Sequence, residues 1–404
     1  MKVLLINNFH YRKGGSESVY FNTAALLRRA GHDVVFFSFD DPQNEPCREQ
    51  EFFVRKGGLL RSAADYFYNC SAARSLDRLL QKEHPDIAHV HLIWGGMSPS
   101  ILRVLKRHGI PVVHTAHDYR MVCPAYAFRT PDGHICERCG GKHFYRCAVH
   151  ACSKGSTAQS IMMAAEMYLR NLLFSPERVL DGIIFVSRFS QQKHFQYAPQ
   201  LQHVKSTVLY NTSPDIDCRF DNRGQRSYFL YAGRLSEEKG PEMMISAFSA
   251  MPELQLKIAG AGPLEESLRQ QAKDCPNIVF EGYKSGDELR ALVADASFVT
   301  VPSQCYENNP MSIIEAYAQG VPVIGSNLGG IPEIVEEGRT GFLFEAGDVT
   351  ALGRVLRHAA ALEQREYDAM CGNARDFARK HFNGDSYTER LTEFYRECIT
   401  NSKK

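Results

Sequence analysis

Four charged residues in the C-terminal half of the chain have types and spacing that suit a ligand carrying phosphates and hydroxyl groups. Arg234 and Lys239 lie in the loop "RLSEEKG", directly after the apolar segment "SYFLYAG". A guanidinium forms paired hydrogen bonds to a phosphate, and an ammonium acts as a mobile point charge, so this loop suits a diphosphate. Glu307 and Glu315 lie on either side of the start of the segment "PMSIIEAYA". Their carboxylates would accept hydrogen bonds from sugar or ribose hydroxyls.

The start of that segment also predicts an anion site. Pro310 is expected at the first helical position, where its missing N–H would have no helical partner. The N–H groups of Met311 and Ser312, with that of Asn309 nearby, would then point out of the helix start. Together with the positive end of the helix dipole, they would hold a phosphate.

A simpler interpretation of the same four residues stays open. Glu315 would be a helix residue favoured by the dipole, and Glu307 a solvated loop residue. Arg234 and Lys239 would form local ion pairs within "RLSEEK", and such pairs contribute little to stability. Spacing alone does not decide between the two interpretations.

Glycines and histidines add weaker signals in both halves of the chain. Gly14 and Gly15 follow the first apolar segment and would let the backbone approach a ligand closely. The fragment "AGAGP" at 259–263 is better explained as a tight turn into a helix than as part of a dinucleotide fingerprint. Strand alternation puts His89 and His91 on one face, and such histidines are mostly structural. Of the strand-end histidines, His117 is the best placed to reach a ligand.

Five of the twelve cysteines lie within thirty residues and suggest a metal site. Four of them, with one C-x-x-C spacing, fit a tetrahedral structural zinc ion, whose ligands would be Cys123, Cys136, Cys139 and Cys147. Cys152, His143 or His150 would be substitute ligands. Free thiols or an adventitious disulfide are the alternatives, and a catalytic zinc is not favoured.

Composition excludes several function classes. The formal net charge is +1, with 44% hydrophobic and 23% charged residues, which argues against disorder and against a general nucleic-acid binder. No apolar run is long enough to span a bilayer. The segment "MKVLLINNFHYRKGG" indicates a first strand and not a signal peptide. We expect a cytoplasmic protein, or one at the inner face of a membrane.

Alternating apolar strands and amphipathic helices predict an α/β fold. Strand-like segments such as "KVLLIN", "DVVFFSF" and "PDIAHVH" fill the first half, and a similar set begins near residue 226. This order predicts two Rossmann-like, doubly wound parallel sheets that face each other across a cleft. The predicted boundaries are 1–205, with a cysteine-rich insert at about 119–155, then 206–380, and a final helix at 381–404.

One further helix, "TAQSIMMAAEMYLRNLLF" at 157–174, has methionines and leucines at helical spacing. Packing in the core or between domains is the favoured interpretation. Contact with a membrane or a lipid-linked acceptor is the alternative.

Taken together, these motifs resemble the retaining glycosyltransferases of family 4, which have the GT-B fold. The resemblance rests on "GRLSEEKG", the E-x7-E pair Glu307/Glu315, the N-terminal "GGSE" and the block "EAYAQGVPVIGSNLGGIPEIVEEGRTGFLF". It spans nearly the whole chain. One departure is "ENNP", which begins at Glu307 and has two asparagines where many relatives have Phe-Gly; Asn308 and Asn309 should offer different backbone and amide contacts to the sugar.

The resemblance implies a role for each candidate residue. Arg234 and Lys239 would hold the diphosphate of a UDP- or GDP-linked sugar, Glu315 the ribose, and Glu307 the transferred sugar. Gly15 would let the N-terminal loop, which includes Gly14, approach the phosphate, and His117 would contact the sugar. The backbone N–H groups that complete the site would come from Asn309, Met311 and Ser312.

The resemblance thus implies an enzyme that transfers a sugar from a nucleotide-diphosphate sugar to a glycan or lipid-linked acceptor, with retention and without a catalytic metal. The leaving phosphate would act as the base, and a surface polysaccharide would be one product class. The alternatives are a nucleotide-sugar epimerase or phosphorylase on the same fold, or a zinc-stabilised binding protein without activity.

Overall fold

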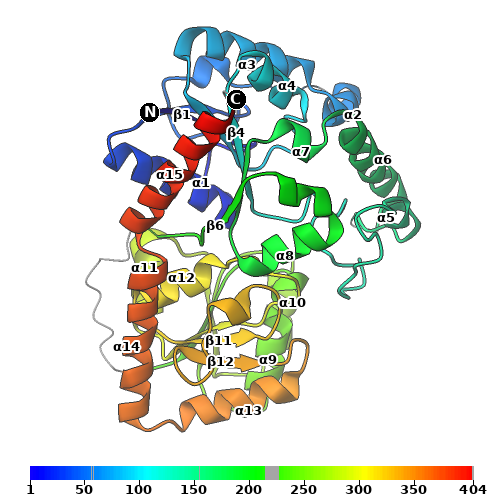
Figure 1. Ribbon diagram of the computed structural model, residues 1–404. Helices are drawn as coiled ribbons and strands as arrows, with labels where there is room; N and C mark the ends of the chain where they lie inside the picture. The colour runs from blue at the N-terminus through cyan, green and yellow to red at the C-terminus, as the bar shows by residue number, and fades with distance from the viewer. Residues whose placement is uncertain (56, 58, 154, 214–226, 403–404) are drawn as a thin grey trace. The chain divides into compact units, whose positions relative to one another are not determined.

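The computed structural model describes residues 1–55, 57, 59–153, 155–213 and 227–402. The chain divides into two compact units (Figure 1). Unit 1 comprises Met1–Tyr210 together with Asp385–Lys404, and unit 2 comprises Asn211–Gly384. Each unit contains one six-stranded sheet with flanking helices.

Unit 1 is built on a parallel sheet with the strand order β2-β1-β3-β4-β5-β6. Its strands are short and mostly fully buried, as expected for a parallel sheet covered on both faces. They are β1 (Lys2–Ile6), β2 (Asp33–Phe37), β3 (Ile87–Val90), β4 (Val112–Ala116), β5 (Gly182–Phe185) and β6 (Ser206–Val208).

The helices of unit 1 connect these strands and cover the sheet. They are α1 (Gly15–Arg29), α2 (Leu59–Phe67), α3 (Cys70–Glu83), α4 (Ser100–Arg107), α5 (Tyr145–Val149), α6 (Thr157–Leu173), α7 (Pro176–Val179), α8 (Arg188–Tyr197) and α15 (Gly384–Ser402), with the short 3₁₀ helices η1 (Gln50–Phe52) and η2 (Pro199–His203).

Unit 2 repeats the plan with the order β12-β11-β10-β7-β8-β9, again all parallel. Its strands are β7 (Phe229–Ala232), β8 (Leu256–Ala259), β9 (Ile278–Gly282), β10 (Phe298–Val301), β11 (Val323–Ser326) and β12 (Gly341–Phe344). Its helices are α9 (Pro241–Ser249), α10 (Glu265–Gln271), α11 (Gly286–Ala294), α12 (Met311–Ala318), α13 (Val349–Ala360) and α14 (Gln364–His381), with η3 (Glu237–Lys239) and η4 (Ile331–Glu333).

Side-chain caps fix several helix starts. Asn69 Oδ1 accepts the N–H of Ala72 at α3, and Asp348 Oδ1 accepts the N–H of Ala351 at α13, so both satisfy donors that helices leave unpaired. The start of α1 differs from the simple expectation that Ser16 caps it. The cap residue is Gly14, and the helix begins at Gly15.

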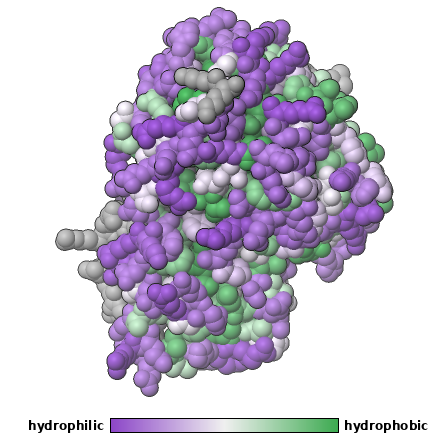
Figure 2. Space-filling model, viewed as in Figure 1, coloured by the Kyte–Doolittle hydropathy of each residue, from purple (hydrophilic) through white to green (hydrophobic). Residues whose placement is uncertain are grey.

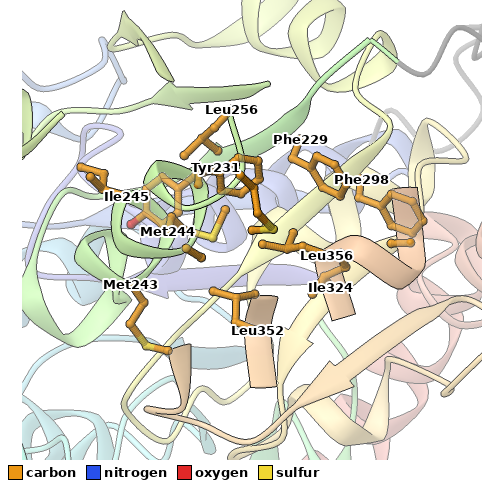
Figure 3. Packing of buried hydrophobic residues seen from close by; sticks show 14 of the residues in the cluster. Phe229, Tyr231, Met243, Met244, Ile245, Leu256, Phe298, Ile324, Leu352 and Leu356 are labelled. Carbon is orange, nitrogen blue, oxygen red and sulfur yellow. The ribbon is translucent and has the colours of Figure 1, made fainter. Parts of the chain in front are cut away.

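Aromatic and aliphatic side chains from one face of the sheet, together with residues of the helices that cover it, form a core cluster of unit 2 (Figure 3). Phe229 and Phe298, from neighbouring strands, stack with ring centroids 5.8 Å apart. Met243, Met244 and Ile245 of α9 are buried in the same cluster. This packing, with the parallel pairing of the two strands, holds β7 and β10 side by side.

The final helix, α15, packs on the sheet of unit 1. The Tyr395 hydroxyl forms a hydrogen bond with His89 Nδ1 at 2.6 Å. The Tyr387 hydroxyl lies 3.1 Å from Thr23 Oγ1. A Cβ at Gly182 of β5 would lie 2.6 Å from Cys398 Sγ, so glycine allows the helix to approach the strand. Residues from α15 complete the core of unit 1.

The boundary between the units falls later than the predicted 205/206. The stretch 188–225, rich in Gln, Asn, Ser and Pro, suggested a connection, but its residues 188–208 form α8, η2 and β6, and β6 pairs with β5 in the first sheet. The edge strand β6 has only three half-buried residues, too few to give an apolar pattern. Residues 214–225 of the predicted connection lie outside the described part of the chain.

Candidate active site

The strand order of unit 2 creates one place where neighbouring strands send their connections in opposite directions. β7 is the first strand of the unit and lies between β10 and β8. In open parallel sheets, ligands bind at this point, beyond the carboxyl ends of the strands. The loop after β7 carries Arg234 and Lys239, and the loop after β10 carries Glu307. The fold therefore places the sequence candidates at the expected edge.

Lys239 and Glu307 are in direct contact. Lys239 Nζ donates to Glu307 Oε1 at 2.5 Å, and Ser303 Oγ donates to the same oxygen at 2.7 Å. The Lys239 side chain keeps 34% of its surface exposed and that of Glu307 11%. A ligand that reaches the Lys239 ammonium would therefore compete with Glu307 for it.

The ion pair keeps both groups charged. Burial disfavours both charged forms, but the mutual attraction and hydrogen bond outweigh it. The pKa of Lys239 is raised above its usual range, and the pKa of Glu307 is lowered, with help from the Ser303 hydroxyl. Ser303 was not singled out from the sequence, although a polar residue directly after a buried strand was its available signal.

Glycines let the surrounding loops support this pair. A Cβ at Gly240 would lie 2.1 Å from the Pro302 carbonyl oxygen, and Gly240 has a φ of +68°. A Cβ at Gly330 would lie 2.1 Å from the Asn308 carbonyl oxygen. The Gly330 N–H donates to the Glu307 carbonyl at 2.7 Å. The "GG" of "SNLGG" is thus needed because the backbone lies directly against the loop that carries Glu307.

The fragment "AGAGP" leads through a turn into α10, as the sequence favoured over a dinucleotide fingerprint. A Cβ at Gly260 would lie 1.9 Å from the Gly233 carbonyl oxygen, and one at Gly262 would lie 2.3 Å from that of Leu235. The Leu235 N–H donates to the Ala261 carbonyl at 3.0 Å. These glycines allow the loop after β8 to pack against the loop that carries Arg234.

The start of α12 lies one residue later than predicted. Pro310 is the cap residue, with extended backbone (φ −67°, ψ 127°), and the first helical residue is Met311. The N–H groups of Met311 and Ser312 still belong to the first turn, which has no intrahelical acceptor for them. Glu315 is half-buried on this helix, and Arg234 is exposed in the loop after β7.

Asn309 has a structural role that the sequence did not reveal. Its Oδ1 accepts the N–H of Asn211 at 2.8 Å, and its carbonyl accepts Asn211 Nδ2 at 2.9 Å. Asn309 is buried, with an exposed fraction of 5%. Its side-chain oxygen is therefore committed to Asn211, and this bond anchors the segment directly before α12. The pairing joins residues nearly a hundred positions apart, so no local pattern could predict it.

In unit 1 the corresponding edge lies between β1 and β3. Asn7 Oδ1 accepts the N–H of Leu92 at 3.0 Å, and the Asn8 N–H donates to the Leu92 carbonyl at 2.8 Å, so the loops after β1 and β3 are bonded together. Gly14 and Gly15 lie at the end of the first of these loops. A Cβ at Gly14 would meet only Glu17 Oε2, at 3.6 Å, which is an ordinary contact.

His117 follows β4 and is paired with His91. His91 Nδ1 lies 2.8 Å from His117 Nε2, and the two rings stack with centroids 5.1 Å apart. His89 and His91 share a face of β3, as alternation predicts, with ring centroids 4.3 Å apart. Burial lowers the pKa of His117 to about 4 and holds the pKa of His91 well below its usual range, so both rings are neutral near pH 7.

The five clustered cysteines are free thiols in this structure. Within the described ranges, no group of three or more His, Cys, Asp or Glu side chains is arranged to hold a metal ion. Cys147 is instead hydrogen-bonded to Cys152, which raises the pKa of Cys147 and lowers that of Cys152 to about 7. Burial raises the pKa of Cys123 to about 11 and that of Cys139 to about 12. The zinc site, with Cys136 as its fourth ligand, stays a prediction that metal analysis would test.

Comparisons with known proteins match nearly the whole chain. The family model described as Glycosyltransferase Family 4 matches residues 13–212, and the model described as Glycosyl transferases group 1 matches residues 215–377. Together the two matches cover both units and include the candidate residues of each.

Curated relatives are similar over different shares of their length. The chain is 26% identical to the sulfoquinovosyl transferase SQD2 of Arabidopsis thaliana over 95% of this chain and 71% of that protein. It is 31% identical to a GDP-mannose-dependent alpha-(1-6)-phosphatidylinositol monomannoside mannosyltransferase of Mycolicibacterium smegmatis, over 45% of this chain and 55% of that protein.

Solved structures agree on the fold. Anabaena Alr3699/HepE, solved in complex with UDP and glucose, superposes with a TM-score of 0.68 at 20% identity, covering 98% of this chain and 100% of that one. At this identity, the match establishes the architecture of two Rossmann-like domains and not the ligand.

Proposed function

The chain belongs to glycosyltransferase family 4 and has the GT-B fold, and from this premise we propose that it transfers a hexose from a nucleotide-diphosphate sugar to an acceptor hydroxyl with retention of configuration. The observation that carries the proposal is the contact between Lys239 and Glu307 at the strand-order reversal of unit 2. A cation and a carboxylate at this edge match the two parts of such a substrate, its diphosphate and its hydroxyl groups.

Each residue then has a role in binding the substrate. Lys239 leaves Glu307 to meet the diphosphate, and the exposed Arg234 binds the same group through its planar guanidinium. Glu307, released from Lys239, accepts hydrogen bonds from the hydroxyls of the transferred sugar. Glu315, in the middle of α12, accepts those of the ribose. The N–H groups of Met311 and Ser312 complete the phosphate site, and Asn309 contributes its backbone N–H.

The residues of unit 1 are assigned roles through family membership. Gly14 and Gly15 allow the backbone to approach the substrate phosphate, and a Cβ at Gly14 would meet only Glu17 Oε2, at 3.6 Å. His117 contacts the transferred sugar. Since its pKa is lowered to about 4, it does so as a neutral hydrogen-bonding group and not as an acid.

Catalysis depends on charge that develops on the leaving diphosphate. Arg234, Lys239 and the start of α12 stabilise this charge more strongly in the transition state than in the bound substrate, which lowers the barrier. The acceptor hydroxyl attacks from the same face as the departing phosphate, and that phosphate takes its proton. In this scheme the side chains and the helix start supply the positive charge, without a catalytic metal.

The substrate class follows from the relatives. The mannosyltransferase relative is named for GDP-mannose, and HepE was solved with UDP, so we propose a UDP- or GDP-linked hexose. We propose a glycan or lipid-linked acceptor, in the biosynthesis of a glycan such as a surface polysaccharide, because other relatives are named for colanic acid and O-antigen biosynthesis.

The test is calorimetric titration with UDP and with GDP of the wild type, Lys239→Ala and Lys257→Ala. Lys257 pairs with Glu281 at 3.1 Å in the same unit, away from the site, and serves as the matched control. We expect selective binding of one nucleotide that is lost in Lys239→Ala and retained in Lys257→Ala. Absence of binding to either nucleotide by the wild type would contradict the proposal.

Product analysis separates the transferase from its alternatives. A transferase forms a new glycoside only when an acceptor is present and releases the nucleoside diphosphate. Conversion of the nucleotide sugar to its epimer, or turnover that requires inorganic phosphate, would favour the epimerase or phosphorylase. If Lys239→Ala and Glu315→Ala left every phenotype unchanged, the alternative of a zinc-stabilised binding protein without activity would be favoured.

A further inference from the structure

Helix α6 of unit 1 has two apolar faces, of which only one is used for packing. Its inner face is buried through Met163, Ala164 and Met167. Its outer face carries Ile161 and Leu172, whose side chains are 54% and 71% exposed. A helix at the surface of a soluble domain normally presents polar residues on this side. The remaining outward apolar residues of α6 are Tyr168, Leu169 and Leu173.

Helix α5 extends this apolar area. Tyr145 and Val149 lie one turn apart on α5 and are exposed, Val149 to 72%. The Tyr145 N–H donates to the Tyr168 hydroxyl at 3.3 Å, and Phe144 packs edge-on against the Tyr168 ring at 5.1 Å. The two helices are therefore joined, and we call their outward residues the α5–α6 surface: Tyr145, Val149, Ile161, Tyr168, Leu169, Leu172 and Leu173.

This exposure is concentrated and not scattered. Of the eleven large hydrophobic side chains that are exposed in the described chain, nine lie between Tyr126 and Leu173. Figure 2 shows green, hydrophobic atoms along the right-hand edge, where Figure 1 places α5 and α6. Contiguous apolar areas of this kind mark interaction surfaces, whereas single exposed apolar residues do not.

The buried side of α6 is fixed, so its outer face cannot turn inward. Arg170 is buried, donates from Nη2 to the Arg120 carbonyl at 2.7 Å, and lies 4.3 Å from the centroid of the Trp94 ring. Arg170 Nε also lies 3.6 Å from Glu166 Oε1. These contacts hold the helix in one rotation about its axis, and in that rotation the leucines point to solvent.

Exposed cations lie beside the apolar residues. Arg138, Lys142 and Arg146 come from α5 and the segment directly before it, and all three are exposed. Across the described residues, none of the three is within ion-pair distance of a carboxylate. Arg146 Nη1 donates to the Arg138 carbonyl at 2.7 Å, and Arg138 Nη1 lies 3.3 Å from His150 Nε2. Cations without a carboxylate partner, next to aliphatic side chains and tyrosines, are typical of surfaces that lie in the headgroup region of an anionic bilayer.

We propose that the α5–α6 surface binds an anionic lipid bilayer, with its leucines inserted below the headgroups and Lys142 and Arg146 against the phosphates. In the described part of the chain, no helix combines the length and apolarity that crossing a bilayer requires, so α6 would lie along the surface. A protein partner would need a complementary acidic and apolar surface, whereas a bilayer supplies both components with no defined shape. The proposal does not depend on the nucleotide-sugar site.

The test is co-sedimentation of the full chain with vesicles of phosphatidylcholine alone and with an equimolar mixture of phosphatidylglycerol and phosphatidylcholine. We expect binding to the mixed vesicles, weakened by salt. Leu172→Ser with Leu173→Ser should reduce this binding at least about tenfold, because two exposed leucines no longer enter the apolar layer. Lys142→Glu with Arg146→Glu should reduce binding to the mixed vesicles only.

The matched control is Val279→Ser with Tyr283→Ser, which removes two exposed apolar residues from unit 2. We expect this variant to bind vesicles as the wild type does. Equal vesicle binding by the wild type and the leucine variant would overturn the proposal. So would a wild-type dimer, seen by sedimentation equilibrium, that the leucine substitutions convert to a monomer. Nucleotide titrations of the same variants should be unchanged, which separates this proposal from that of the active site.

Discussion

At the scale of single residues, the sequence predicted which side chains carry charge at the site but not how they pair. Lys239 and Glu307 follow two different strands, and the rule for parallel sheets was enough to place them at one edge. The bond between Asn309 and Asn211, and the stacking of His91 on His117, join residues from separate loops. Such pairings depend on the folded backbone, so composition and spacing could not predict them.

The Lys239–Glu307 pair predicts opposite effects on binding and turnover. Glu307→Gln removes the carboxylate that neutralises Lys239, so the affinity for UDP or GDP should rise. The same change should lower kcat by about a hundredfold, because a sugar contact and the positioning of Lys239 are lost. Titration calorimetry and initial rates on one preparation measure the two effects. Weaker nucleotide binding in Glu307→Gln would show that the carboxylate does not compete for the lysine.

His91 is expected to position His117. His91→Ala removes the ring whose Nδ1 lies 2.8 Å from His117 Nε2, and we expect kcat to fall about tenfold. His91→Asn places an amide nitrogen or oxygen near the same point and should recover most of the rate. Rates and melting temperatures of both variants would be compared. Equal rates in the two variants would indicate that His91 contributes packing only.

At the scale of elements, prediction succeeded for long periodic segments and failed at short or polar ones. α6 was expected at 157–174 and spans Thr157–Leu173. β6 was missed because its three residues are half-buried and carry no apolar pattern. The starts of α1 and α12 were misplaced by one or two residues, since cap positions depend on the backbone of the preceding loop.

Glycine substitutions separate ligand contact from loop support. Gly14→Ala adds a Cβ that meets only Glu17 Oε2 at 3.6 Å, so folding should be unchanged while nucleotide-sugar affinity falls.

Gly330→Ala adds a Cβ 2.1 Å from the Asn308 carbonyl oxygen, so the Glu307 loop must move, and both stability and affinity should fall. Gly372→Ala in α14 meets nothing within 4 Å and should stabilise the chain by about 1 kcal/mol. Melting curves and calorimetry on the three variants distinguish these outcomes, and unchanged affinity in Gly14→Ala would remove that glycine from the site.

At the scale of the whole molecule, the two units share one architecture but differ in their number of histidines. Thirteen of the fifteen histidines belong to unit 1 and two, His358 and His381, to unit 2. Burial lowers the pKa of several histidines in unit 1: to about 4 for His10, His117 and His194, and to about 3 for His114. The shifts of His114 in β4 and of His117 directly after it follow from the fold, because the surroundings that desolvate these rings exist only when the parallel sheet forms.

The asymmetry predicts that acid destabilises unit 1 first. As pH falls below the ordinary histidine value of 6.5, the unfolded chain binds protons that the buried, neutral rings do not, so folding free energy is lost progressively down to about pH 4. In unit 2, the lowered pKa of Glu307 adds stability that is lost only when pH falls through the carboxylate range, below its ordinary value of 4.5. Hydrogen exchange at about pH 7 and pH 5, corrected for intrinsic rates, should show a larger loss of protection in β3 and β4 than in β10 and β11. Equal losses in both sheets would mean that the buried histidines of unit 1 do not set its stability in acid.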